Sequence, residues 1–300
     1  MKRLVCVFTG LTLLATFTFS EHALGASRRS KRSPRKPVVR EVAQRNTVPF
    51  ESALVEDANT GEVLFEKDPF KKWPPASMTK MMLLLITMEK VRFGSISLND
   101  RVTISRTATN TGGTRIYLRE KEVFPLEVLL KAVLMNSAND AARAVAEHVA
   151  GSVPQFVDLM NQKTAQLKME DTHFTTVNGL PSKPGTVADI TTAHDMAKLA
   201  RVLINYSEIL DWASIRAETI RVGKRTIQLH NVNRLIGFYP GADGLKTGYI
   251  RRSKFNLTAT AERGGKRLIS VVMGAPTNQK RFIETARLLD LGFKLISKGS

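Results

Sequence analysis

Cysteine is almost absent from this chain of 300 residues. The single thiol, Cys6, lies within the first 26 residues, a segment that has the features of a removable leader. A mature chain without thiols forms no disulfide and offers no thiolate to a metal ion. Thiol catalysis and cysteine-based metal sites are therefore excluded, and stability must come from the buried core.

The sequence also lacks an uninterrupted apolar run long enough to cross a bilayer. Lys2 and Arg3 precede an apolar stretch over residues 4–19, which is interrupted by several threonines and a glycine. A membrane span needs about 20 predominantly apolar residues, and the small residues at 23–26 are typical of a signal peptidase site. We expect residues 1–26 to be a cleaved signal peptide rather than a permanent anchor. The protein is then exported to the periplasm or cell envelope.

Acidic residues are nearly missing from the segment after this leader. Residues 27–45 carry eight basic residues against one acid, Glu41, in a chain of formal net charge +18. Such a segment has little to bury, and we predict a disordered arm over residues 27–48. It is either a site of adhesion to anionic envelope polymers, through residues 27–45, or a solvated linker without a partner. The export signal argues against a nucleic-acid partner.

The rest of the chain, residues 49–296, is predicted to be one domain of the α+β class. Apolar and polar patterning predicts a hairpin at its start, strands near its end and helices between them. The expected strands are 52–56, 62–65, 246–250, 255–262 and 267–274, and the expected helices are 78–91, 125–135, 138–150, 154–169, 192–206 and 278–295. Strands at both ends around a helical middle predict an antiparallel sheet built from the two chain ends, with an all-helical subdomain inserted.

Three short motifs follow one another in this domain. They are Ser77-Met-Thr-Lys80, Ser137-Ala-Asn139 and Lys246-Thr-Gly248. Each is weak alone, because Ser33-Pro-Arg-Lys36 and Ser97-Leu-Asn99 match the first two patterns elsewhere. Their order, with Ser77 opening a long apolar helix, indicates an acyl-transfer site built around a serine nucleophile.

The spacing of the first motif supports this chemistry. Residues three apart on a helix share one face, so Lys80 is expected within reach of Ser77. A lysine of ordinary pKa, about 10.4, is protonated at neutral pH and accepts no proton. Burial and a second cation, for which Lys246 is the candidate, would lower that pKa.

The remaining motif residues are assigned to proton transfer and substrate binding. Ser137 is a candidate relay of a proton to the leaving amine, and Asn139 offers a donor and an acceptor to a substrate backbone. The strand with Lys246 is expected to pair with an extended peptide, with the Thr247 hydroxyl facing an acid group and Gly248 leaving space for the backbone. This chemistry requires no metal and no cofactor.

With these motifs the chain resembles the D-alanyl-D-alanine carboxypeptidases, the low-molecular-mass penicillin-binding proteins. The resemblance covers residues 49–293 and rests on the three motifs together with other stretches, which are Asp57-Ala-Asn-Thr-Gly61, Gly112-Gly-Thr-Arg115, Thr172-His-Phe174, Asn178-Gly179 and Asp243-Gly-Leu. It implies a β-lactamase-like transpeptidase fold, peptidoglycan stem peptides as substrates and β-lactam antibiotics as acylating inhibitors. It also implies Ser77 as the acylated nucleophile, Lys80 as the base, an oxyanion hole from the amides of Ser77 and Tyr249, and Arg281 as a carboxylate-binding residue.

Two departures from the family pattern limit the comparison. Ile250 and Lys254 replace a hydroxyl residue and a glycine of many relatives, which affects the rim of the site. No extra C-terminal domain is expected after residue 296.

Three alternatives to a carboxypeptidase remain. One is a D,D-endopeptidase on cross-links, and another is a β-lactamase, which needs a carboxylate base. The third is an inactive wall-binding protein. No Glu-x-x-x-Asn follows Ser137, because Glu170 is followed four residues later by Phe174.

Overall fold

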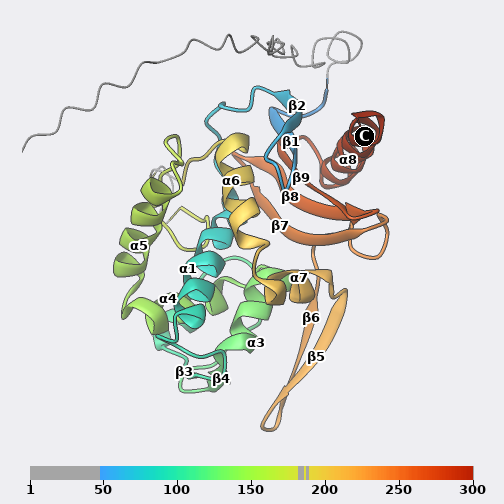
Figure 1. Ribbon diagram of the computed structural model, residues 1–300. Coiled ribbons are helices and arrows are strands. Elements are labelled where there is room, and N and C mark those ends of the chain that lie inside the picture. Colours follow the sequence, from blue (N-terminus) through green and yellow to red (C-terminus); the bar gives the residue numbers. More distant parts are fainter. Residues whose placement is uncertain (1–47, 182–185, 187–188, 300) are drawn as a thin grey trace, which may run out of the picture. The chain divides into compact units, whose positions relative to one another are not determined.

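Residues 48–181, 186 and 189–299 are described by the computed structural model of the protein (Figure 1). All of them belong to the second of the two parts, Met1–Lys36 and Pro37–Ser300, into which the chain divides. The predicted signal peptide, and the predicted arm apart from Val48, lie outside the described residues. Within the described ranges no helix is both long and apolar enough to span a bilayer.

A five-stranded antiparallel sheet joins the beginning and the end of the described chain. Its strand order is β2-β1-β9-β8-β7. The strands are β1 (Ser52–Asp57), β2 (Val63–Lys67), β7 (Ala242–Ile250), β8 (Lys254–Arg263) and β9 (Lys266–Ala275). Strand β1 pairs with β9 from Ser52 opposite Met273 to Asp57 opposite Leu268. The predicted sheet from both chain ends is therefore confirmed.

Both faces of this sheet are covered, which explains the composition of its central strands. All six residues of β1 and six consecutive residues of β8 are buried, because a strand covered on both faces has no solvent side to alternate with. The long helix α8 (Asn278–Gly299) packs on β8 and β9 at one face, and α6 (Ala193–Leu203) packs at the other (Figure 1). Strands β8 and β9 turn at Gly264 and Gly265, whose φ values of +55° and +71° suit glycine.

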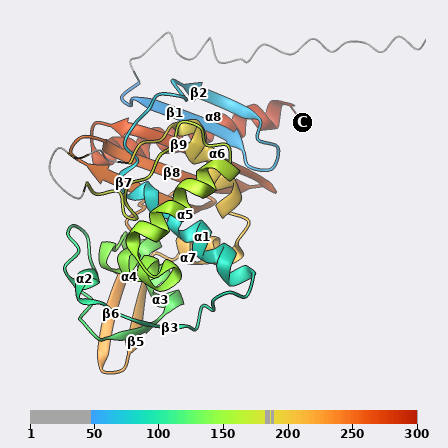
Figure 2. The same cartoon turned by 90° about the vertical axis from the view of Figure 1, so that its left-hand side faces the viewer.

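The helical part is inserted between β2 and β7 (Figure 2). Its other helices are α1 (Lys80–Arg92), α2 (Arg106–Thr109), α3 (Leu126–Lys131), α4 (Asn139–Ala150), α5 (Val153–Gln166) and α7 (Ser207–Ser214). Helix α1 contacts α4, α5 and α6, and its residues from Lys80 to Met88 are all buried. A helix that is apolar on all sides belongs in a core, so α1 holds its first residues rigidly.

The helix boundaries agree with the sequence signals in part. Thr192 caps α6 by accepting a hydrogen bond from the Asp195 amide, as the capping box predicts. The helix predicted over 78–91 is preceded by a 3₁₀ turn, η2 (Ala76–Thr79), and the helix predicted over 125–135 divides into α3 and a π-helical turn, η3 (Ala132–Asn136).

Two small two-stranded sheets have no counterpart among the strands predicted from sequence. Strand β3 (Arg101–Thr103) pairs with β4 (Val123–Pro125), and β5 (Ala217–Val222) pairs with β6 (Arg225–His230). The β5–β6 hairpin extends from the helical side in Figure 1. Polar and apolar residues alternate along its strands, and the apolar side chains of Ile220, Ile227 and Leu229 are buried. Alternation this short gives a weak sequence signal.

Candidate active site

The first motif lies where η2 passes into α1. Ser77 is on the 3₁₀ turn and partly exposed, whereas Lys80 opens α1 and is fully buried. The Lys80 Nζ atom lies 2.9 Å from Ser77 Oγ. It also donates to Asn139 Oδ1 at 2.6 Å and to the Asn178 carbonyl at 3.0 Å. Three oxygens thus fix the amine beside the hydroxyl, as the spacing of the motif predicts.

The second motif lies at the junction of η3 and α4 and contacts the first motif through Asn139. Ser137 is buried and adopts a left-handed conformation, φ 60° and ψ 31°, between η3 and α4. Non-glycine residues in this region store strain and are frequent at functional sites. Asn139 uses both ends of its amide within the protein, because Oδ1 accepts from Lys80 while Nδ2 donates to the Gly112 carbonyl at 2.7 Å. Asn139 thus links Lys80 to the Gly112 backbone, and its expected contact with a substrate backbone stays a prediction.

The third motif lies on β7, next to the turn that carries the serine. Lys246 and Thr247 are buried. A Cβ at Gly248 would lie 2.3 Å from the Pro75 carbonyl oxygen, so the glycine lets β7 approach the backbone that precedes Ser77. Its expected role of leaving space for a substrate backbone stays a prediction.

The last two predicted residues lie at the end of β7 and behind it. Tyr249 is exposed, and its ring stacks on Phe255 at a centroid distance of 4.3 Å. Arg281, on α8, is buried and donates from one nitrogen to the carbonyls of Gly248 and Asn256, both at 3.3 Å. Its Nε has no partner among the described residues. Arg281 is thus a buried cation beneath the motif strand and not a surface residue.

The rim of the site shows one effect of the sequence departures. Lys254 adopts φ +54°, the conformation that favours the glycine found in many relatives. Its ammonium group forms an ion pair with Glu51 at 3.1 Å, and this contact fixes the position of the side chain.

Burial lowers the pKa of both lysines of the site. Burial lowers the pKa of Lys80 to about 7, while the negative charges of Asp189 and Asp140 oppose this change. Burial also lowers the pKa of Lys246 well below its ordinary value, with the charges of Lys80 and Arg281 adding to the effect. Burial is thus the largest cause for both lysines, and the repulsion between Lys80 and Lys246 agrees with the expected influence of a second cation.

Three polar groups of the site were not assigned a role from the sequence. The Asn178 carbonyl binds Lys80, and Asp189 accepts a hydrogen bond from Thr79, between the serine and the lysine. Asp140 binds the amides of Ile116 and Leu118 at 3.2 and 3.0 Å. Asn178 follows a stretch typical of the family, but a backbone carbonyl leaves no sequence signal of its own.

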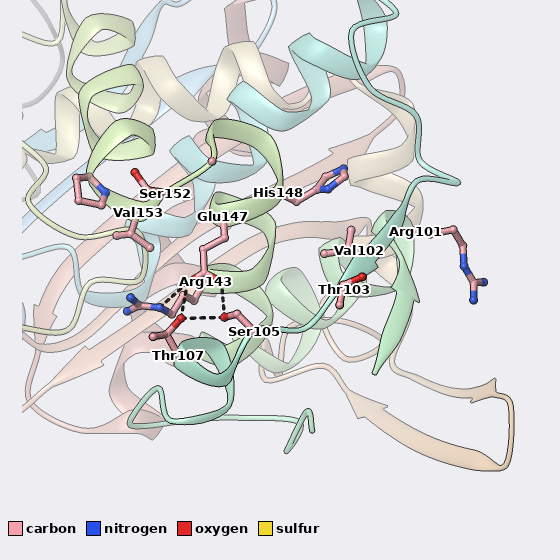
Figure 3. Close-up of a pocket in the computed structure, with 12 residues that line it drawn as sticks. Arg101, Val102, Thr103, Ser105, Thr107, Arg143, Glu147, His148, Ser152 and Val153 are labelled. Carbon is pink, nitrogen blue, oxygen red and sulfur yellow. Dashed lines mark hydrogen bonds and ion pairs between the residues drawn. The ribbon is translucent and has the colours of Figure 1, made fainter. Parts of the chain in front are cut away.

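A separate pocket of about 600 Å³ lies on the helical side, between β3 and the turn that joins α4 to α5 (Figure 3). The Glu147 carboxylate in it accepts hydrogen bonds from Ser105, Thr107 and Arg143. His148, which we interpret as structural, pairs with Asp100 at 3.2 Å. These polar groups satisfy one another, and the pocket contains no residue of the three motifs.

The sheet, the helical insertion and the serine–lysine pair together define the class of serine D,D-peptidases and transpeptidases. The chain belongs to the D-alanyl-D-alanine carboxypeptidase family, whose sequence model matches residues 39–277. The resemblance inferred from the motifs is thereby confirmed.

Curated relatives agree with this family. The chain is 37% identical to the D-alanyl-D-alanine carboxypeptidase DacF of Bacillus subtilis, over 81% of this chain and 61% of the relative. It is 36% identical to DacC of Escherichia coli, over 80% and 60% of the two chains. The chain thus spans about three fifths of the length of these relatives. DacB2 of Mycobacterium tuberculosis is matched over 85% of its length, at 31% identity over 84% of this chain.

Solved structures give the same result for the fold. Penicillin-binding protein D2 of Listeria monocytogenes, in its ampicillin-bound form, superposes with a TM-score of 0.74 at 31% identity, over 83% of this chain and 98% of that one. A serine-to-alanine mutant of the K15 DD-transpeptidase of Streptomyces superposes with a TM-score of 0.78 at 25% identity, over 83% and 99% of the two chains.

Proposed function

We propose that the protein is a serine-type D-Ala-D-Ala carboxypeptidase that acts on peptidoglycan stem peptides through an acyl-enzyme on Ser77. The observation that carries the proposal is the buried Lys80 amine, 2.9 Å from Ser77 Oγ. With a pKa of about 7, this amine is largely available as a base near neutral pH. The family assignment supplies the class of substrate.

In the first step Ser77 Oγ attacks the carbonyl carbon of the penultimate D-alanine. Lys80 takes the hydroxyl proton and returns it to Ser137, whose own hydroxyl proton passes to the amine of the departing D-alanine as the amide bond breaks. Lys80 is thereby neutral again. The amides of Ser77 and Tyr249 are proposed to stabilise the oxyanion. Water then hydrolyses the ester, with Lys80 again as the base, and releases the shortened stem peptide.

The motif strand is proposed to hold the substrate. An extended peptide adds its backbone along β7, and the terminal carboxylate binds the Thr247 hydroxyl in the positive field of Lys246 and Arg281. An arriving carboxylate favours the charged form of Lys246, so we expect binding of an anionic substrate to be accompanied by proton uptake.

β-Lactam antibiotics are proposed to acylate the same serine. The carboxylates that act on Lys80 are Asp140 and Asp189, whose oxygens are occupied by amides and hydroxyls. Glu170 is exposed. Among the described residues, none of these three is placed as a free base for the water that would remove the drug, so the adduct is expected to persist.

Mass spectrometry of the purified protein tests this function. After incubation with benzylpenicillin, a lasting mass increase on the peptide containing Ser77, together with D-alanine release from a pentapeptide, supports the carboxypeptidase. Hydrolysed drug without a lasting adduct indicates a β-lactamase, and faster cleavage of a cross-linked dimer than of the pentapeptide indicates an endopeptidase. Neither adduct nor product indicates an inactive wall-binding protein.

The proposed location follows from the N-terminal sequence and the family. We propose that residues 1–26 direct export to the cell envelope and are removed. Residues 27–45 are proposed to adhere to anionic polymers there, since their charge is almost entirely of one sign. Deleting residues 27–45 and measuring sedimentation with cell walls at low and high salt tests the adhesion.

A further inference from the structure

A buried carboxylate that no motif includes lies beneath the serine–lysine turn. Asp189 is 2% exposed and accepts five hydrogen bonds from described residues. Its Oδ1 accepts from the Thr175 amide at 2.8 Å, the Thr175 hydroxyl at 3.1 Å and the Thr176 amide at 2.9 Å. Its Oδ2 accepts from the Thr79 hydroxyl at 2.7 Å and the Thr176 hydroxyl at 2.8 Å.

These bonds connect two segments that both touch Lys80. Thr79 stands between the nucleophile and the base on one segment. On the other, the Thr176 hydroxyl accepts from the Gly179 amide at 2.8 Å, and the neighbouring Asn178 carbonyl accepts from Lys80 at 3.0 Å. Gly179 also contacts the nucleophile turn directly, because a Cβ there would lie 2.0 Å from the Ala76 carbonyl oxygen. The carboxylate therefore closes a ring of contacts around the Lys80 amine.

We propose that Asp189 is a positioning residue for acyl transfer, which fastens the turn over residues 175–179 to Thr79 and so holds the Asn178 carbonyl on the Lys80 amine. The proposal rests on the proposed function of the serine–lysine pair. A neutral side chain would make weaker bonds at this place, because hydrogen bonds to an ionised acceptor are about twice as strong as neutral ones.

The charge of Asp189 has a second consequence for the base. Asp189 and Asp140 both favour the charged form of Lys80 and oppose the lowering of its pKa by burial. Lys246 faces Lys80 from β7, and its own pKa is lowered by burial and by the charges of Lys80 and Arg281. It is left unaltered when Asp189 is replaced. Removing the Asp189 charge should therefore lower the pKa of Lys80 further.

Asp195 offers a matched comparison within the same part of the chain. It is also 2% exposed, and its Oδ2 accepts from the Thr172 hydroxyl at 2.8 Å and from the Asp171 amide at 3.2 Å. None of its described bonds goes to the serine–lysine turn or to the turn over residues 175–179. Asp195→Asn thus removes one negative charge from an equally buried site and leaves the bonds between Thr79 and the turn over residues 175–179 intact.

The experiment measures the second-order rate of acylation of the full chain by a fluorescent penicillin between about pH 5 and pH 9, a range that spans the titration of the base. For Asp189→Asn we expect the plateau rate to fall about tenfold. We also expect the acid limb of the profile to move to lower pH. Thr79→Val removes the hydrogen bond from Thr79 to Asp189 and keeps the Asp189 charge. For this variant we expect a similar fall in the plateau rate, with no shift of the acid limb along the pH axis. Asp195→Asn should keep both the plateau and the limb of the original protein.

The possible outcomes separate the inference from the function on which it rests. Rates and limbs that match the unaltered protein in both Asp189→Asn and Thr79→Val would overturn the inference. Equal losses in Asp189→Asn and Asp195→Asn, without a shift of the limb, would assign Asp189 to folding alone. Should Asp189→Asn not fold, as judged by circular dichroism, the rate of Thr79→Val decides. Lack of acylation in the unaltered protein would contradict the proposed function itself.

Discussion

Two lysines meet at this site from two regions of the fold, and their surroundings differ. Lys80, at the start of α1, donates to three oxygens and lies in the field of two carboxylates. Lys246, on β7, donates to the Thr247 carbonyl at 3.2 Å and lies in the field of two cations. Both ammonium groups are fully buried, so desolvation alone does not distinguish them. Their neighbours do.

The difference divides the work of the site between the helix and the strand. Burial lowers the pKa of Lys80 to about 7 against the opposing charges of Asp189 and Asp140, and near this value one group accepts and returns a proton with equal ease. Burial lowers the pKa of Lys246 well below its ordinary value, and the charges of Lys80 and Arg281 add to this effect, so an arriving anion would favour its charged form. In the proposed mechanism the helix supplies the base and the strand supplies the binding site for a carboxylate.

Among these variants, Lys80→Arg should cause the largest loss in the rate of acylation. It keeps a cation at the start of α1, but a guanidinium does not give up its proton in a protein. Loss of general base catalysis costs about 10² to 10⁴ in rate, and we expect acylation by penicillin to fall by about that factor. The stopped-flow acylation rate measures it. A rate within tenfold of the original would show that Lys80 is not the base.

Arg281→Ala tests the strand side through the charge of the substrate. Loss of a charge-assisted hydrogen bond should lower kcat/KM for a free-acid peptide by about 10- to 150-fold. The corresponding peptide amide should hardly change, since it carries no charge for Arg281 to attract. Arg281→Lys is the matched control, because it keeps the cation and should retain most of the preference for the acid.

Equal losses on acid and amide would give Arg281 a different role. Its bonds to the carbonyls of Gly248 and Asn256 would then serve to hold β7 in place, and the carboxylate site would lie elsewhere.

The pH dependence of acylation sharpens the comparison between the two lysines. Only the neutral form of Lys80 accepts a proton, so the rate should rise with pH and level off above about 7. Below that value it should fall about tenfold per pH unit. Lys246→Met should lower the rate and move this limb to higher pH, because the charges of Lys80 and Lys246 oppose each other. A limb that stays in place would show that Lys246 has no influence on the titration of Lys80.

Gly179→Ala should have the smallest effect on the acylation rate, and this effect should act through the Lys80 amine and not through β7. The new Cβ would meet the Ala76 carbonyl oxygen, and the residue would have to keep φ +83°. We expect a loss of about 1–3 kcal/mol in the free energy of unfolding and a several-fold lower acylation rate, as Asn178 moves from Lys80. Gly264→Ala is the control, because its φ is also positive but no atom lies within 4 Å of the new Cβ. Equal destabilisation in both variants would leave only backbone strain.

The strands of the sheet and the central helix could be predicted from the sequence, because the patterns that indicate them are local. Residues three apart in continuous helical turns share one face whatever the rest of the fold does. The predicted proximity of Ser77, on η2, and Lys80, at the start of α1, is therefore confirmed. The capping signal at Thr192 and the glycine pair before Lys266 act over a few residues. The β5–β6 hairpin was not predicted, because the alternation of polar and apolar residues in its strands is short and the core that it covers comes from other segments.

The sequence by itself therefore determined which groups the site contains, and the tertiary structure decided what each of them experiences. A pKa depends on burial and on charges brought from distant segments, which no spacing encodes. Only the folded chain places Asp189 and Asp140 around Lys80, and Arg281 behind Lys246. The same holds for Gly248, whose missing side chain accommodates the Pro75 carbonyl from 173 residues earlier. Long-range contacts of this kind exist only once the sheet has joined the two ends of the domain.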